Sequence, residues 1–421
     1  MEACERCREH HGLNKSEILK VTAEHVNPGR VARWQAFGVN LVIGHREGYR
    51  ITDKDGRELW DVHLNGGTFN LGHRHPALVA ALKDAADEYD IGNHHFASEA
   101  RARFALDLLA LAPANLTHVV YASGGSEAVD IAIKSARWAT GRRKILSVDK
   151  GYHGRTGLSG AVGDDSSARY FLSEDDAHCI TVPFNDCKAV DEAFKAHDFA
   201  GVIIEPVPAT YGFPVPNPDF LMSLRSHCDK QGTLLIADEV QTGLMRSGQM
   251  WAIERFGLEA DILVTSKGLS AGMYPMAATL LSAPVSGWLR ENGWAHVNTY
   301  GGAEIGCEVA RKALEIYASE ETRRNVAALN EQFGTGLGTL AGKYTALAGI
   351  RQTGLIIGIE TDRADGGQVL MKALFDAGVW AIFASYDPRV LQFKPGLLLT
   401  RAEADDILDR LETALRTMER L

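Results

Sequence analysis

Two short apolar runs in the middle of the chain each lead to a polar side chain. Residues 234–237 (LLIA) lead directly to Asp238, and residues 261–265 (DILVT) lead through one serine to Lys267. Runs of this length without a polar face are typical of strands buried on both sides of a parallel sheet. Because open α/β sheets bind ligands at the carboxyl ends of their strands, the pattern predicts a site containing a carboxylate and an amine.

The same pattern extends to both sides of these runs, with strand-like segments alternating with amphipathic helices. The expected strands are 117–122, 144–148, 179–184, 201–207, 233–237 and 261–265, and the expected helices are 126–140, 188–197, 220–230 and 303–317. This alternation predicts a large, mostly parallel sheet covered by helices, and the last helix is expected to leave that domain.

The two ends of the chain predict smaller α+β structure. Near the amino end we expect a helix capped by Ser16 and ended by 27–29 (NPG), then a hairpin with Asp55-Gly56 in its turn, then a helix over 77–89. Towards the carboxyl end the expected strands are 354–359, 380–385 and 390–399, and the expected helices are 367–377 and 402–421. We therefore expect an N-terminal segment of a small lobe (1–65), a large domain (66–318) and a C-terminal small domain (319–421).

Composition narrows the class of protein. The net charge of −10 over 421 residues is spread without long charged blocks, which argues against nucleic acid or an anionic membrane as partner. No apolar stretch reaches the length of a membrane span and the first residues are polar, so we expect a cytoplasmic protein. The six cysteines predict no disulfide framework.

Metal-ligand side chains gather in two places, and neither predicts a metal site. These are Cys4, Cys7, His10 and His11 at the amino terminus, and the histidines His73, His75, His94 and His95. The first group crowds into a terminal segment, where four well-placed zinc ligands are not expected. The second has no carboxylate or cysteine at ligand spacing. We expect no bound metal.

An amine and a carboxylate at neighbouring strand ends suit one chemistry well. Lysine forms Schiff bases with carbonyl compounds, and pyridoxal 5′-phosphate (PLP) uses this linkage together with an acidic partner on its ring nitrogen. The alternative is a solvated loop lysine and a helix-capping aspartate. The segments 238–243 (DEVQTG) and 266–268 (SKG) resemble the class III (ornithine/4-aminobutyrate type) PLP-dependent aminotransferases. The resemblance implies PLP-dependent transferase fold type I, with Lys267 and Asp238 as catalytic residues.

Two further segments carry the same resemblance. Residues 123–128 (SGGSEA) are similar to the family's SG[ST]EA turn, which implies that Gly125 and Ser126 bind the cofactor phosphate at a helix start that Ser126 can also cap. Residues 151–156 (GYHGRT) resemble [YF]HGRT, which implies that Tyr152 stacks on the pyridine ring. In some relatives the arginine matching Arg155 binds a substrate carboxylate, and in others it can be structural.

Three more cofactor contacts follow from the resemblance. It implies that Glu205 lies beneath the cofactor and that Gln241 hydrogen-bonds near its phenolate oxygen. Residues 299–302 (TYGG) resemble T[FY]GGNP, in which Thr299 reaches the cofactor of a neighbouring subunit, so a homodimer with shared active sites is expected. Here 303–304 (AE) replaces the family's Asn-Pro, which leaves the start of the following helix open.

The chain departs from the family where the substrate α-carboxylate is usually bound. Relatives that handle both α-amino acids and ω-amines pair an arginine with a glutamate at positions that Gln392 and Thr210 occupy here. The absence of both the arginine and the glutamate is physically consistent, because the absence of only one would leave the other as an unpaired buried charge. An α-carboxylate is therefore expected to bind, if at all, through Arg155, Lys394 or another group.

The expected activity is ping-pong transamination between a primary amine or ω-amino compound and a carbonyl acceptor, either a 2-oxo acid or an aldehyde. Lys267 is expected to hold PLP and to act as the general base that moves a proton from the donor carbon to the cofactor. The alternatives are an amino-acid racemase, epimerase or lyase on the same fold, and a catalytically silent PLP-binding protein. The sequence does not identify the donor, the acceptor or any assembly beyond a dimer.

Overall fold

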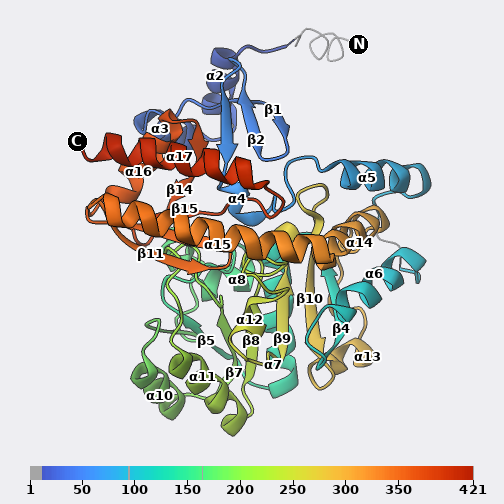
Figure 1. Cartoon of the computed structure of the whole chain (residues 1–421). Helices are drawn as coiled ribbons and strands as arrows, with labels where there is room; N and C mark the ends of the chain where they lie inside the picture. Colours follow the sequence, from blue (N-terminus) through green and yellow to red (C-terminus); the bar gives the residue numbers. More distant parts are fainter. Residues whose placement is uncertain (1–11, 93–94, 164, 421) are drawn as a thin grey trace.

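The computed structural model describes residues 12–92, 95–163 and 165–420, which form three β-sheets surrounded by helices (Figure 1). The large sheet has the order β4 (Leu116–Ala122), β10 (Ala277–Ser282), β9 (Ile262–Thr265), β8 (Leu234–Asp238), β7 (Phe199–Ile204), β5 (Lys144–Val148) and β6 (Cys179–Val182). The two smaller sheets are β1 (Ile43–Glu47), β2 (Arg50–Asp53), β3 (Glu58–Asp61) and β13 (Val379–Trp380), and β11 (Leu347–Thr353), β12 (Ile356–Thr361), β15 (Val390–Phe393) and β14 (Ile382–Phe383).

The large sheet confirms the predicted mostly parallel arrangement. Strands β7, β8 and β9 are parallel neighbours, with Ile236 opposite Ile203 on one side and Ile262 on the other. Strand β10, which the sequence pattern did not predict, lies antiparallel between β9 and β4. Because β7, β8 and β9 run side by side in one direction, their carboxyl ends meet at one edge of the sheet.

Each face of this sheet packs into a separate part of the core. In β8, Leu235 and Ala237 contribute to the largest apolar cluster, whereas Ile236 points to the opposite face and packs with apolar residues of the helix that follows β4. All of these side chains are completely buried. Burial on both sides explains why the strand has no polar face along its length.

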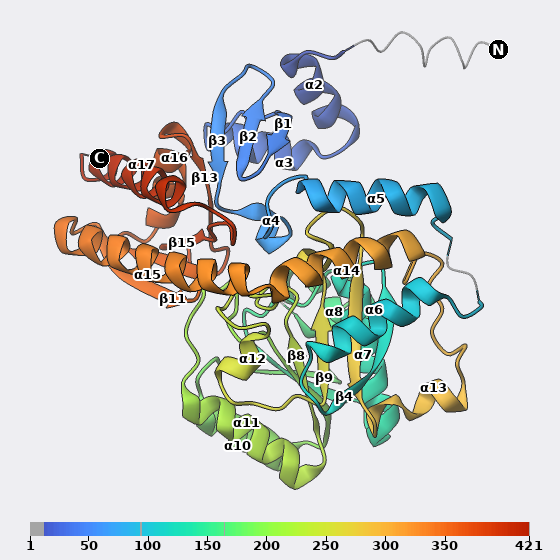
Figure 2. The ribbon, with the colours of Figure 1, turned by 45° about the vertical axis from the view of Figure 1, so that its right-hand side comes forward.

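Helices cover both faces of the sheet, as Figure 2 shows for the large domain. They are α2 (Lys15–His25), α3 (Pro28–Ala36), α4 (Leu64–Gly67), α5 (Pro76–Glu88), α6 (Glu99–Ala110), α7 (Gly125–Thr140), α8 (Gly157–Val162), α9 (Asp165–Tyr170), α10 (Cys187–Ala196), α11 (Pro218–Gln231), α12 (Ala252–Arg255), α13 (Trp288–Glu291), α14 (Glu304–Ala318), α15 (Glu320–Lys343), α16 (Gly366–Asp376) and α17 (Arg401–Met418), with 3₁₀ turns η1 (Lys267–Ser270) and η2 (Val285–Gly287). Among the residues described, no helix combines the length and apolar character needed to cross a bilayer.

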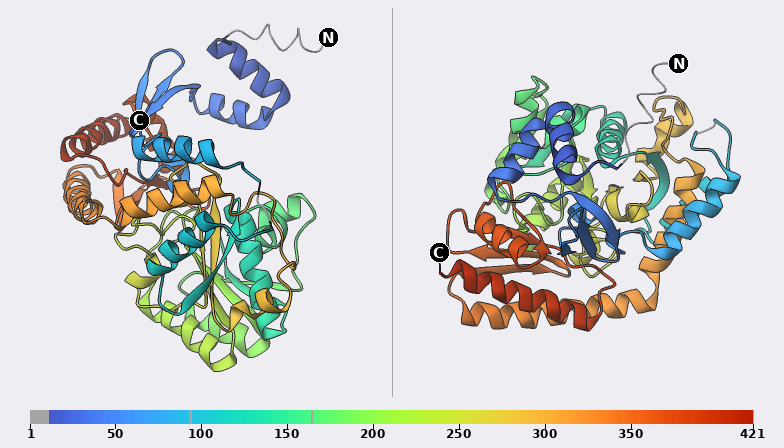
Figure 3. Two further views of the ribbon diagram at one scale, coloured as in Figure 1. Left: turned by 90° about the vertical axis from the view of Figure 1, so that its right-hand side faces the viewer. Right: turned by 90° about the horizontal axis from the view of Figure 1, so that it is seen from above.

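The N-terminal segment confirms the predicted hairpin and corrects two helix ends. Strands β2 and β3 pair antiparallel, and β3 also pairs with β13 from the C-terminal part of the chain. The first helix is capped by Asn14, not Ser16, because the Asn14 side chain accepts a hydrogen bond from the Glu17 amide. Asn27 does not simply end that helix but caps α3, so α2 and α3 form a helical pair at one end of the molecule (Figure 3).

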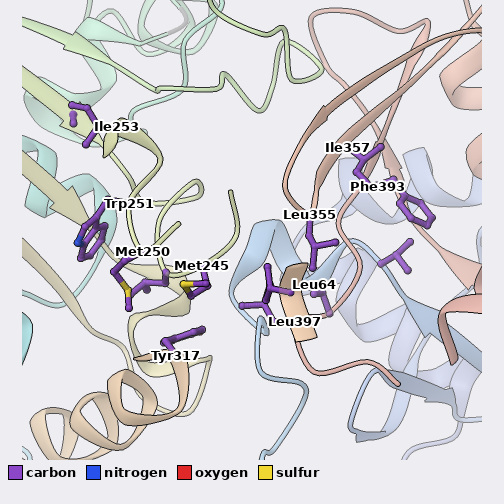
Figure 4. Close-up of a cluster of buried hydrophobic side chains, with 14 of the residues drawn as sticks. Leu64, Met245, Met250, Trp251, Ile253, Tyr317, Leu355, Ile357, Phe393 and Leu397 are labelled. Carbon is purple, nitrogen blue, oxygen red and sulfur yellow. The ribbon is translucent and has the colours of Figure 1, made fainter. Parts of the chain in front are cut away.

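The C-terminal segment differs from its prediction in four elements. The long helix α15 and the strand β11 were not predicted. The expected strand over 390–399 ends at Phe393, and the expected strand over 380–385 is split between β13 and β14. Apolar side chains link this segment to the large domain: Figure 4 shows Leu64, Leu355 and Leu397 on one side of the cluster and Met245, Met250 and Tyr317 on the other.

Candidate active site

A cavity of about 150 Å³ lies at the carboxyl ends of β7, β8 and β9. It is lined by Gly125, Ser126, Tyr152, His153, Gly154, Glu205, Asp238, Val240, Gln241, Ser266 and Lys267. Seven of the ten predicted site residues are among them, whereas Arg155, Thr299 and Lys394 are not. The position agrees with the expected location of ligands in open α/β sheets.

Lys267 stands just beyond the end of β9, in an unusual backbone conformation. Its φ of 46° is in the left-handed region, which ordinary side chains rarely adopt outside functional sites. The next residue has no side chain because there is no room for one: a Cβ on Gly268 would lie 2.8 Å from Asn70 Nδ2 and 3.1 Å from the Tyr317 hydroxyl. Tyr317 also donates a hydrogen bond to the Gly268 carbonyl at 2.8 Å, which fixes the turn that presents the lysine.

The charge state of Lys267 is shifted towards the neutral amine. Burial lowers the pKa of Lys267, and the negative charges of Asp238 and Glu205 offset only part of this effect. A lysine with a lowered pKa holds more unprotonated amine at neutral pH, which is the form that attacks carbonyl carbons and accepts protons.

Asp238 ends β8 and is held by two polar contacts. Its Oδ2 lies 2.8 Å from His153 Nδ1, and its Oδ1 accepts a hydrogen bond from the Val240 amide at 3.1 Å. Burial disfavours the charged imidazolium and by itself would lower the pKa of His153. The hydrogen bond to Asp238 and the negative charges of Asp238 and Glu205 outweigh this effect and raise the pKa of His153. The pair thus fixes the orientation of a nearly buried carboxylate that lines the cavity.

Glu205 follows β7 and holds the segment that carries Tyr152. Its Oε1 accepts a hydrogen bond from the Tyr152 amide at 2.8 Å, and its Oε2 accepts one from the Ala209 amide at 3.2 Å. Burial raises the pKa of Glu205, and the neighbouring His153 acts in the opposite direction. Glu205 therefore joins two loops beside the cavity.

The start of α7 forms the other wall of the cavity. The predicted cap at Ser126 is wrong: Ser126 is the second residue of the helix, and the capping position is Gly124, which has no side chain to offer. The amides of the first turn are consequently left available to an anion. Gly154 passes so close to Ser126 that a Cβ there would lie 2.4 Å from the Ser126 hydroxyl oxygen.

These residues fit PLP. The side-chain oxygen of Gln241 is buried and has no hydrogen-bond partner within the described part of the chain, so the cavity offers a polar group that a bound ligand can satisfy. The uncapped start of α7 suits a phosphate, and Asp238 suits a protonated ring nitrogen. Lys267 supplies the amine that would hold the aldehyde carbon.

The three remaining predicted residues lie outside this cavity. Thr299 is solvent-exposed in the loop between α13 and α14. Arg155 is also exposed, with its guanidinium 5.1 Å from the centre of the Tyr152 ring. Lys394 is completely buried, and its ammonium donates a hydrogen bond to Gln392 Oε1 at 2.7 Å.

Sequence reasoning did not single out four residues that line the cavity: His153, Gly154, Val240 and Ser266. Each neighbours a residue that was singled out, and His153 directly follows Tyr152. The sequence signal for His153 is that a histidine in a loop beside a strand end can pair with a nearby carboxylate.

The metal-ligand groups considered from the sequence can be placed only in part. Cys4, Cys7, His10, His11 and His94 lie outside the described residues. His73 contacts Asp61, with 2.9 Å between Nε2 and Oδ2. Over residues 12–92, 95–163 and 165–420, no group of three or more His, Cys, Asp or Glu side chains could hold a metal ion.

Comparisons with known proteins agree with this geometry. The family model for class III aminotransferases matches residues 32–415. An uncharacterised aminotransferase of Archaeoglobus fulgidus is 43% identical over 401 residues, covering 95% of this chain and 94% of its own. The ornithine aminotransferase of Toxoplasma gondii has a similar structure (TM-score 0.88, 25% identity, 100% and 98% of the chains covered). So does an amine transaminase from an uncultivated Pseudomonas species in its PLP-bound form (TM-score 0.80, 28% identity, 90% and 95% covered).

The family match covers most of the chain. The chain belongs to the class III aminotransferases, which are PLP-dependent enzymes of the α/β fold described above.

Proposed function

We propose that this aminotransferase moves an amino group between a primary amine or ω-amino compound and a carbonyl acceptor, a 2-oxo acid or an aldehyde, in two half-reactions at one site. The observation that carries the proposal is that Lys267 and Asp238 line the same small cavity at the ends of neighbouring strands. When bound there, PLP supplies an electron sink for the carbon that loses its proton.

In this proposal the side chains of the cavity have separate tasks. Lys267 would hold the cofactor through its amine and, once the amine donor has taken its place, would accept the proton from the donor carbon. Its lowered pKa supports this role, because a general base must be unprotonated when the substrate arrives. Asp238 would keep the ring nitrogen protonated, and the contact of His153 with Asp238 Oδ2 holds this carboxylate in place.

The remaining residues bind and orient the cofactor. Gly125 and Ser126 bind the phosphate at the start of α7, and Gln241 contacts the phenolate oxygen. Tyr152 stacks on the ring, and Glu205 holds its backbone. An aromatic side chain at this position would hold the ring in one orientation relative to the bond that is broken. Substrate carboxylates are bound by Arg155 or Lys394.

We further propose a homodimer in which Thr299 reaches the cofactor of the partner subunit. Thr299 is exposed and does not line the cavity of its own chain. This position is expected for a residue that contacts the cofactor of a partner subunit. The loop before α14 and the loop after α5 lie together, since the rings of His95 and Trp294 are 4.6 Å apart. Both loops expose large apolar side chains: Ile91 (53%), Phe96 (81%), Trp294 (65%), Val297 (57%) and Tyr300 (53%). Such a patch is typical of a protein interface.

The four described cysteines are all free thiols, and two of them, Cys228 and Cys307, are buried. Reduced cysteines of this kind suit a reducing compartment, which supports a cytoplasmic location.

The proposal can be tested with single amines and no acceptor. We expect purified enzyme to convert one equivalent of bound cofactor to its pyridoxamine form while releasing one equivalent of carbonyl product, and a 2-oxo acid to restore the starting spectrum. Lys267→Ala should bind cofactor without this conversion. Return of the enantiomer of the donor, or loss of a group other than the amine, without pyridoxamine formation would instead indicate a racemase or a lyase.

A further inference from the structure

Lys394 is an unusual residue because its side-chain amine is completely buried. It follows β15 directly, and its backbone amide donates a hydrogen bond to the Val62 carbonyl at 2.7 Å. Its side-chain nitrogen donates to Gln392 Oε1 at 2.7 Å and lies 5.2 Å from the centre of the Phe213 ring. A neutral amide and an aromatic face are therefore its immediate surroundings.

Within residues 12–92, 95–163 and 165–420, no carboxylate lies within ion-pair distance of the Lys394 nitrogen. The charged groups that act on it are Arg246, Lys267 and Asp61, and only the last is negative. Asp61 is already committed: it contacts His73 at 2.9 Å and accepts hydrogen bonds from the amides of His63 and Leu64. Burial, followed by the positive charges of Arg246 and Lys267, holds the pKa of Lys394 well below its usual value.

His63 is a second basic group with spare hydrogen-bonding capacity. Its Nδ1 is buried and has no partner among the described residues. Burial, Lys394 and Lys267 together hold the pKa of His63 well below its usual value, so this imidazole lies within electrostatic reach of both lysines. The chain from His63 leads to Gly66, where a Cβ would lie 3.4 Å from Lys267 Cε. The backbone contact between Lys394 and Val62 places the segment of His63 beside Lys394, and the same segment approaches Lys267 at Gly66.

We propose that Lys394 and His63 form a carboxylate subsite in which Lys394 takes up a proton with an acidic substrate and remains a neutral amine when the substrate has no carboxylate. The inference rests on the proposed function, whose two half-reactions bring different substrates to one site. The proton comes from solvent, so a carboxylate and a proton enter together and the net charge of the subsite does not change. To reach the substrate, the ammonium leaves Gln392, whose amide then also faces the carboxylate.

The physical reason is the penalty for an unpaired buried charge. A permanently charged group such as arginine would be left without a partner whenever a carboxylate-free amine occupied the site. A buried lysine avoids this penalty by releasing its proton. The same lysine can serve acidic and carboxylate-free substrates without a neutralising glutamate nearby.

The test uses glutarate, which has carboxylates but no amine or carbonyl, as a probe of the PLP-loaded enzyme. Titration calorimetry near pH 8, in buffers of different ionisation enthalpy, measures how many protons bind with it. We expect uptake approaching one proton per site in the wild type and none in Lys394→Met, with glutarate affinity lower on the order of 10- to 100-fold. Lys188→Met, at an 86% exposed side chain, controls for loss of a lysine.

Lys394→Arg provides a second test, in which the side chain keeps its ability to bind a carboxylate. Because arginine stays protonated, this variant should bind glutarate without proton uptake, while its turnover of carboxylate-free amines falls roughly tenfold or more. Glutarate binding without uptake in the wild type, equal uptake in Lys394→Met, or no glutarate binding at all would overturn the inference. If amines alone fail to produce the pyridoxamine form in the wild type, the proposed function fails instead.

Discussion

Replacing Glu127 with methionine should release the loop over 296–301 that carries Thr299. Glu127 Oε2 accepts hydrogen bonds from the side chain of Asn298 at 2.5 Å and from the amide of Ser123 at 3.1 Å. Its Oε1 lies 3.3 Å from His296 Nε2. Asn298 Oδ1 in turn accepts hydrogen bonds from the amides of Tyr300 and Gly301, both at 2.8 Å. A single carboxylate thus connects the start of α7 to the loop before α14.

The magnitude follows from the contacts that Glu127 makes to the loop. A hydrogen bond to a charged group contributes about 1.5–3 kcal/mol when it is shielded from water. The Glu127 side chain is 28% exposed, so solvent replaces part of what is lost. We therefore expect the hydrogen bond between Glu127 and Asn298 to contribute about 2 kcal/mol, which corresponds to roughly a 30-fold change in the opening equilibrium of the loop.

Amide hydrogen exchange measures this opening directly. In Glu127→Met, exchange at Tyr300 and Gly301 should accelerate roughly 30-fold, because local opening exposes their amides. Glu127→Gln keeps an acceptor for Asn298 and should give a smaller change. Glu291→Gln, at an exposed residue of α13, is the control. Unchanged exchange in Glu127→Met, or equal acceleration in the control, would refute the reasoning.

Three further predictions concern charge. In Asp238→Asn the pKa of His153 should fall, because the hydrogen bond and the negative charge that raise it are removed. NMR of the imidazole measures this pKa, and an unchanged value would show that Asp238 does not raise it. Burial raises the pKa of Glu239 to about 7, so between pH 4.5 and 7 the folded chain keeps a proton that the unfolded chain releases. The free energy of unfolding should therefore fall by about 3 kcal/mol over this range. Denaturant titrations measure this fall, and Glu239→Gln should remove it. Because the pKa of Lys394 is lowered in the folded chain, unfolding takes up a proton at this residue below pH 10.5. The stability of the cofactor-free protein should therefore rise as the pH approaches 10.5. An equal rise in Lys394→Met would contradict this prediction.

The site at the strand ends could be predicted because it depends on local patterns. Residues 234–238 and 261–267 each combine an apolar run with one polar end, and parallel neighbours place those ends together. The turn 123–126 joins the same edge from β4, which is separated from β9 only by the antiparallel strand β10.

The missed elements have weaker local signals. Strand β10 (AATLLS) is a short apolar run that periodicity cannot distinguish from part of a buried helix. Helix α15 contains Gly334, Gly336, Gly338 and Gly342, which lower its helix propensity, and its stability comes from packing that includes Phe333 and Leu337. The burial of Lys394 depends on Phe213 and Val62, which are distant in the sequence.

The central claim is that Lys267 holds the cofactor, and covalent trapping tests it most directly. Borohydride reduction of the PLP-loaded enzyme, followed by protease digestion and mass spectrometry, should place the pyridoxyl group on the peptide that contains Lys267. Lys267→Ala should yield no modified peptide. A pyridoxyl group found on Lys150, Lys394 or any other lysine of the wild type would contradict the account.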